Sequence, residues 1–233
     1  MKFSRPRCLA LLAAAFAGVE VATVQPTVCQ SVIIFRHIAG LTLIPTLILS
    51  LSSALLAIVA WRWWPDLGLG LAAERAPLGW LQSNWLIACA TAASLRTVLP
   101  GGTRIWTVMG GLIFLAALDE RFMIHEQLQE GIADGLLASV VIADARLAER
   151  LAQGLTAVYA IAGLLAAMWL RKAANPAPWA WMRAGIVVGI VAIGLDLASD
   201  ELGLQVIEEV IEFAAETLML CGLVTEVRSA VSR

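Results

Sequence analysis

The chain has 233 residues, of which 60% are hydrophobic and only 15% are charged. A soluble domain usually carries about 25% charged residues, so this composition is that of a membrane protein. The formal net charge is −2, and the sequence has no basic stripe of the kind that phosphate binding needs. We therefore exclude nucleic acid as a partner and expect the lipid bilayer instead.

Residues 1–30 are predicted to form an N-terminal extension that is either signal-like or interfacial. Lys2, Arg5 and Arg7 precede an apolar stretch from residue 8 to residue 22, as in the n-region and h-region of a signal peptide. Glu20 interrupts that stretch, and the sequence around Ala22 is a poor cleavage site. A cleaved signal, an interfacial helix and an extension upstream of the true start all remain open.

Residues 31–233 are predicted to form a single all-α domain, a polytopic transmembrane helical bundle. A span needs about 20 mainly apolar residues, and segments near that length recur along the chain. The six expected spans are 37–60, 79–97, 104–122, 151–170, 180–198 and 204–225. The stretch 123–150 is predicted as an acidic connection, in which the apolar patch at 136–142 could form an interfacial helix.

The loops differ in charge, and this predicts an orientation in the membrane. One set of loops and ends collects the basic residues Arg36, Arg96, Arg104, Arg171, Lys172, Arg183, Arg228 and Arg233. The positive-inside rule puts this set in the cytoplasm. Both ends of the six-span core are then cytoplasmic, and the acidic loops face outward.

Two small-residue features predict packing rather than chemistry. Gly185 and Gly189 form a GxxxG pattern, which is typical of closely packed helices. Cys89 and Cys221 fall in apolar segments, where we expect small buried hydrophobic side chains.

Two acidic segments stand out because ionisable groups at membrane depth are costly and mark candidate functional sites. The first, residues 119–126, follows an apolar run and contains Asp119, His125 and Glu126. The second lies in the last predicted span, where Glu209, Glu212 and Glu216 are spaced to share one helix face. Both segments are expected at the outer side, so their side chains could converge in one pocket.

Three interpretations of these acids stay open. Carboxylates with one imidazole suit a divalent metal such as Zn, Mn or Fe, and the candidate ligands are Asp119, His125, Glu126, Glu209, Glu212 and Glu216. Alternatively, Glu216 lies about 10 Å beyond Glu209 along a helix, and such a ladder is what proton- or cation-coupled transporters use. The plainest interpretation is that the charges pair with one another between helices, in a structural protein or an accessory subunit of a larger membrane complex.

At these residues the chain resembles a group of uncharacterised bacterial multi-pass membrane proteins. Those proteins carry a Leu-Asp-Glu-x4-His-Glu motif at the end of one span and a Glu-Glu-x2-Glu motif in the last span. The matching positions here are Leu118-Asp119-Glu120 with His125-Glu126, and Glu208-Glu209 with Glu212. Members of that group often have a serine where this chain has Ala117, which argues against a role for a hydroxyl there. The resemblance implies an integral membrane protein of about six helices and implies no particular activity.

Overall fold

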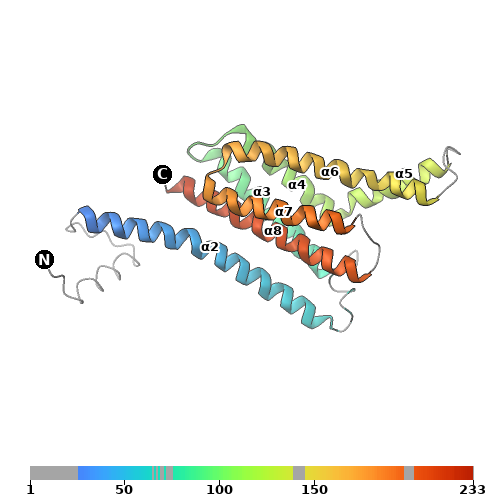
Figure 1. The fold of residues 1–233 in the computed structure, drawn as a ribbon, viewed down its shortest axis with the longest axis horizontal. Coiled ribbons are helices and arrows are strands. Elements are labelled where there is room, and N and C mark those ends of the chain that lie inside the picture. The colour runs from blue at the N-terminus through green and yellow to red at the C-terminus, as the bar shows by residue number, and fades with distance from the viewer. Residues whose placement is uncertain are drawn as a thin grey trace. The chain divides into compact units, whose positions relative to one another are not determined.

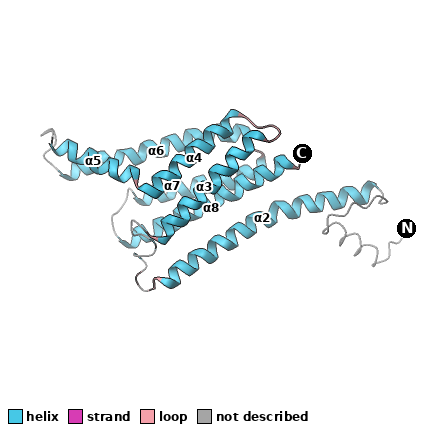
Figure 2. Ribbon diagram, turned by 180° about the vertical axis from the view of Figure 1, so that it is seen from behind, coloured by secondary structure: helices cyan, strands magenta, loops and turns pink. Residues whose placement is uncertain are grey.

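The structure, a computed structural model, is helical throughout the part of the chain that it describes (Figure 2). That part comprises residues 26–64, 66, 68, 71, 76–138, 145–196 and 202–232. Side chains are described from residue 43 onward, except at some positions such as 125–126, 136–138 and several in the first half of α6. The helices are α2 (Pro26–Arg62), α3 (Pro77–Val98), α4 (Arg104–Phe122), α5 (Ile124–Ala138), α6 (Ala145–Ala173), α7 (Pro176–Asp196) and α8 (Leu202–Val231). The predicted all-α fold is confirmed for these residues.

The chain divides into two compact units, Met1–Thr46 and Leu47–Arg233. The described part of the first unit is the N-terminal portion of α2, which begins at Pro26, a residue well suited to the first turn of a helix. Most of the predicted extension at residues 1–30 lies outside the described residues. All the contacts discussed below belong to the second unit.

Five of the six predicted spans fall within a helix, and the span predicted at 180–198 does so as far as Asp196, where the described part of α7 ends. Two segments among the described residues are long and apolar enough to cross a membrane. They are Leu43–Arg62 in α2 and Pro176–Leu195 in α7. Helices α4, α6 and α8 carry more charged residues, whereas α3 has one arginine and several uncharged polar residues. In α8, for example, five glutamates and one arginine interrupt the apolar sequence.

Helix α5 is the main difference from the prediction, which had an acidic connection over residues 123–150. The chain leaves α4 through Met123, whose positive φ of 52° ends that helix, and starts α5 at the next residue. Ile124, Leu128 and Ile132 recur every four residues, and this helical spacing is the signal that the acidic residues around it obscured. The patch predicted at 136–142 lies mostly beyond the described residues.

The helices of the second unit pack as a bundle around α3 and α8 (Figure 1). Helix α8 packs along α7 and against α3, and α3 also packs against α4. Helix α5 packs on α6, which makes smaller contacts with α4 and α7. The glutamate-rich helix α8 is thus the one that packs along both α7 and α3, and its side chains meet those of its neighbours.

Glycines allow α7 and α8 to approach closely. A Cβ built on Gly185 would lie 2.7 Å from the Ala215 carbonyl oxygen and 3.0 Å from the Met219 nitrogen, both in the α8 backbone. Gly189 faces the same helix, at 3.7 Å from the Ala215 Cβ. The predicted role of the GxxxG pattern in helix packing is therefore confirmed.

Apolar side chains fill the bundle in two clusters. The larger one is built on buried residues such as Trp106, Leu170, Met182 and Leu223. The smaller one joins Val59, Leu71, Leu78 and Phe213 near the starts of α3 and α8. Cys89 and Cys221 are buried, as the sequence predicts, and neither forms a disulfide. Any polar group between these clusters is shielded from solvent and needs a partner inside the protein.

Candidate functional site

Polar side chains gather at one end of the bundle, where α3 and α8 begin and α4 ends. We call this the acidic end and define it by Gln82, Glu120, Glu209, Glu212 and Glu216. Gln82 is fully buried, and its Nε2 donates a hydrogen bond of 3.1 Å to Glu209 Oε2. A Cβ built on Gly79 would lie 3.5 Å from Glu120 Oε1, so the end of α4 lies against the start of α3.

Helices α3 and α8 run in the same direction past this site. Gln82 contacts Glu209, and the Cys89 thiol lies 3.9 Å from the carbonyl oxygen of Glu216. Both pairs of positions are seven residues apart, 82 to 89 and 209 to 216. Glu216 therefore lies about two turns, or roughly 10 Å, deeper in the bundle than Glu209.

Glu216 is the deepest acid of this group. Its side chain is 6% exposed, and its Oε2 atom has no hydrogen-bond partner within the described part of the chain. Glu212 and Glu209 precede it by four and seven residues on the same helix, and Glu120 lies at the end of α4, against the start of α3. Four carboxyl groups from two helices thus lie at this end, and the Oε2 atom of the innermost one has no hydrogen-bond partner among the described residues.

Gln82 also has a buried oxygen atom without a hydrogen-bond partner among the described residues. Its Oε1 is buried and has no hydrogen-bond donor among the residues that the structure describes. The amide nitrogen faces the Glu209 carboxylate, which is the favourable orientation because a carbonyl oxygen there would be repelled. The acidic end therefore contains two buried oxygen acceptors, on α3 and α8, that lack a donor.

Arg121, at the end of α4, is engaged with an aromatic ring. The Arg121 guanidinium stacks over the Trp80 ring, with its central carbon 3.8 Å from the ring centroid. Such cation–π contacts hold a guanidinium against the ring face. Arg121 thereby joins the end of α4 to the start of α3.

Thr217, the next residue along α8, belongs to a layer of polar contacts between three helices. The Thr217 hydroxyl lies 3.1 Å from the Ser52 hydroxyl and donates to the Phe213 carbonyl at 2.8 Å. The Trp85 indole nitrogen donates to the same Ser52 oxygen at 3.1 Å. This layer ties the C-terminal part of α2 to α3 and α8 at the depth of Glu216.

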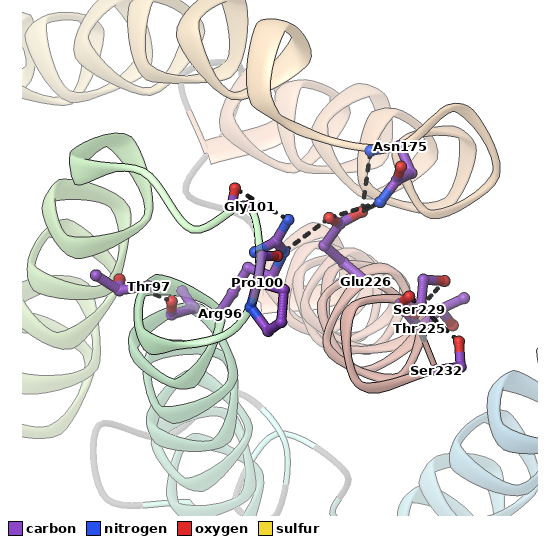
Figure 3. A network of polar contacts seen from close by, with 10 residues as sticks. Arg96, Thr97, Pro100, Gly101, Asn175, Thr225, Glu226, Ser229 and Ser232 are labelled. Carbon is purple, nitrogen blue, oxygen red and sulfur yellow. Dashed lines mark hydrogen bonds and ion pairs between the residues drawn. The ribbon is translucent and has the colours of Figure 1, made fainter.

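The opposite end of α3 and α8 contains a second buried charge network, which we call the clamp (Figure 3). Arg96 Nε donates to Glu226 Oε1 at 2.9 Å, and the two side chains are 3% and 0% exposed. The remaining Arg96 nitrogens donate to the carbonyls of Pro100 at 3.0 Å and Gly101 at 3.3 Å. Gly101 presents its carbonyl from a turn with φ of 71°, which favours glycine.

Asn175 completes the clamp from the turn between α6 and α7. Its backbone nitrogen donates to Glu226 Oε2 at 2.9 Å, and its side-chain nitrogen lies 2.8 and 2.9 Å from the two Glu226 oxygens. Arg96 also lies over the Trp106 ring, 5.6 Å from its centroid. Every charged atom of this network has a partner, so the clamp is a structural element rather than a binding site.

The six predicted ligands are placed differently by the structure. Glu209, Glu212 and Glu216 lie together at the acidic end, as the helical spacing predicts. The backbone of His125 and Glu126 begins α5 directly after the end of α4, while their side chains lie outside the described residues. Asp119 has its carbonyl oxygen bonded to the Met123 nitrogen at 2.6 Å, which caps α4. Within the described residues no group of three such side chains is arranged to hold a metal ion, and the predicted metal site stays a prediction.

Sequence reasoning missed the residues on other helices that meet these acids. In the sequence, Gln82 looks like a polar residue at the start of a helix, and Arg96 looks like a basic residue next to a loop. Glu226 and Asn175 carry no motif at all. The one available signal was the free-energy cost of burying a charge. An acid at position 226, inside an apolar segment, requires a partner.

Comparison with known proteins gives one match. A family model described as a domain of unknown function (DUF8692) matches residues 8–227. No curated protein and no solved structure matches the chain. The match covers both acidic segments, helices α2 to α7 and α8 as far as residue 227.

Proposed function

The chain belongs to the family described as a domain of unknown function, DUF8692, and we propose that it is a multi-pass inner-membrane protein that moves a proton or another cation. In this proposal α2, α3, α4, α6, α7 and α8 are the six spans. Both ends of the six-span core are cytoplasmic, and the acidic end faces outward. The excess of arginine and lysine at the other end supports this orientation.

Exposed apolar side chains support the membrane location. Large hydrophobic residues are more than 40% exposed along α2, α6 and α7. On α6 alone the exposed set is Leu147, Leu151, Val158, Ile161, Leu164, Leu165, Met168 and Trp169. Soluble proteins rarely expose contiguous apolar surface of this extent, whereas lipid chains would cover it.

The observation that carries the proposed activity is the Glu216 side chain. It is 6% exposed, its Oε2 is unpartnered within the described residues, and three further carboxyl groups act on it. An uncompensated buried charge is expensive, so this carboxyl group needs a bound proton or cation. Three further acids of the acidic end, Glu212, Glu209 and Glu120, lie between Glu216 and the starts of α3 and α8. Such a series of acids is typical of proton and cation paths.

Replacing Glu216 by glutamine is expected to abolish cation movement. The amide cannot take up a proton or carry a negative charge, while its size and shape are those of the native side chain. The measurement is the internal pH and the membrane potential of liposomes that contain the purified protein. Glu130→Gln is the matched control, because Glu130 is an exposed acid on α5, and this variant should transport at the wild-type rate. Undiminished flux in Glu216→Gln would overturn the proposal.

A divalent metal at the acidic end is the second candidate. It is favoured by the position of His125 and Glu126, whose backbone follows directly from α4, the helix that brings Glu120 to Glu216. Imidazole and carboxylate ligands suit zinc, manganese and iron.

The metal proposal predicts stoichiometric metal in the purified protein. His125→Ala and Glu209→Gln should each lower the metal content at least tenfold, because removing one ligand of a small set weakens binding strongly. Elemental analysis after dialysis measures the metal content of each purified variant, with Glu130→Gln as the control. Metal-free wild-type protein that retains full activity would rule out this candidate.

A further inference from the structure

We propose that the clamp is a gate, which closes the bundle at the end opposite the acidic end and opens by admitting water to Arg96 and Glu226 together. In the proposed function, on which this inference rests, a cation that enters at the acidic end and reaches Glu216 has to leave at the other end. The clamp lies at that other end, so it controls the exit in addition to holding the helices together.

The clamp lies beyond the last of the acids, on the same side of α8. Glu226 follows Glu216 by ten residues, which is about 15 Å along a helix. Helix geometry puts Glu209, Glu216 and Glu226 within about 100° of one another around α8. Between Glu216 and Glu226 that face carries Met219 and Leu223. The row of acids is therefore interrupted by apolar residues before the clamp is reached.

An apolar layer closes the bundle between Glu216 and the clamp. Leu223 of α8 is 1% exposed, and Met182 of α7 and Trp106 of α4 are fully buried. These three residues pack with Ala93 of α3 in the larger apolar cluster. A charged group is costly in such a layer unless water enters with it, so passage beyond Glu216 requires the helices to part here.

The clamp is suited to opening because it lies close to the surface. Pro100 and Gly101, whose carbonyls accept hydrogen bonds from Arg96, are both exposed (Figure 3). The charges of a buried ion pair have given up their hydration, and this loss offsets much of their attraction. Water that reaches Arg96 and Glu226 together restores that hydration. Opening the pair therefore costs much less than removing one partner by mutation.

An unsatisfied donor next to the clamp also favours opening. The Arg96 guanidinium lies over the Trp106 ring, with its central carbon 5.6 Å from the ring centroid. The Trp106 Nε1 atom is buried and has no acceptor within the described part of the chain. A buried N–H without a partner destabilises the closed state, and water that enters on opening would accept from it.

The test measures the labelling of single thiols on the two sides of the apolar layer. Leu223→Cys introduces a thiol next to the clamp, and the native Cys89 lies 3.9 Å from the Glu216 carbonyl oxygen. Each reporter protein keeps one of these thiols, and its other cysteines are replaced by serine or alanine. The full-length protein in detergent is treated with a small charged methanethiosulfonate. Labelling through brief openings measures the population of the open form.

Asn175→Ala is expected to raise the labelling rate of Leu223→Cys at least tenfold. The change removes the side-chain hydrogen bonds to Glu226 and leaves Arg96 in place, so no buried charge loses its counter-charge. Hydrogen bonds to a charged group are among the stronger ones in proteins. The labelling rate of Cys89 should stay within about twofold, because the acidic side of the layer is not opened.

The control is Asn84→Ala, at an exposed asparagine of α3, which should leave both labelling rates unchanged. If the clamp only supports the fold, Asn175→Ala will raise the labelling of both thiols by the same factor, in step with a loss of thermal stability. That result overturns the gate. An unchanged rate at Leu223→Cys, or a rise at Cys89 alone, also overturns it.

Failure of the gate differs from failure of the proposed transport activity. Cation flux that depends on Glu216, without selective labelling of Leu223→Cys, would refute the gate and leave transport in place. Selective labelling in a protein that moves no cation would establish opening at the clamp and refute transport.

Discussion

Arg96→Met is expected to lower the free energy of unfolding by about 3–5 kcal/mol, because it leaves a fully buried carboxylate without its cation. Glu226 is 0% exposed, and Arg96 provides its ion pair at 2.9 Å. The same change removes the donors that hold the Pro100 and Gly101 carbonyls at the end of α3. Chemical or thermal unfolding in detergent measures the effect.

Two further variants make this result specific to the clamp. Arg171→Met removes an exposed positive charge from α6 and should change stability by no more than about 0.5 kcal/mol. The double variant Arg96→Met with Glu226→Met should recover most of the loss, because replacing both charges removes the buried ion. A double variant as unstable as Arg96→Met alone would show that the pair does not act as a unit.

Gly222→Ala is expected to destabilise the protein by about 1–3 kcal/mol through overpacking. A Cβ at this position would lie 2.9 Å from both the Met182 nitrogen and the Pro178 carbonyl oxygen, and would also meet the Met182 side chain. The first two atoms belong to the α7 backbone, so the helices themselves would have to separate. Thermal unfolding in detergent measures this loss as well.

Gly111→Ala provides the matched control for that variant. Nothing lies within 4 Å of a Cβ built on Gly111, which is in the middle of α4. Alanine favours a helix by up to about 1 kcal/mol over glycine, so this variant should be neutral or more stable. Changes of the same sign in both variants would contradict close packing of α7 on α8.

The helices were predictable from the sequence because apolar length and turn residues determine them locally. Pro77 begins α3, Pro176 begins α7, and the turn at Pro100 and Gly101 separates α3 from α4. Helix α5 was not predicted because glutamate and aspartate on its surface made the segment look like a loop. Its apolar residues at 124, 128 and 132 were the better guide.

The candidate site was predictable only where it lies on a single helix. The spacing of Glu209, Glu212 and Glu216 identifies a common face, since helix geometry relates residues three, four and seven apart. The partners on other helices depend on how the helices pack, which spacing within one helix does not reveal. Gln82 was therefore interpreted as a polar residue at the start of a helix. The pairing of Arg96 with Glu226 left no pattern in the sequence near either residue.

The clamp has a consequence for the register between α3 and α8. Acids recur at nearly every turn of the first half of α8, so a slide of one turn, about 5.4 Å, would offer Gln82 the carboxylate of Glu212 in place of Glu209. The same slide would remove Glu226 from its donors on Arg96 and Asn175. Buried ion pairs are best known for fixing such alignments. One buried ion pair thus sets the alignment of the two helices, while the row of acids leaves the partner of Gln82 exchangeable.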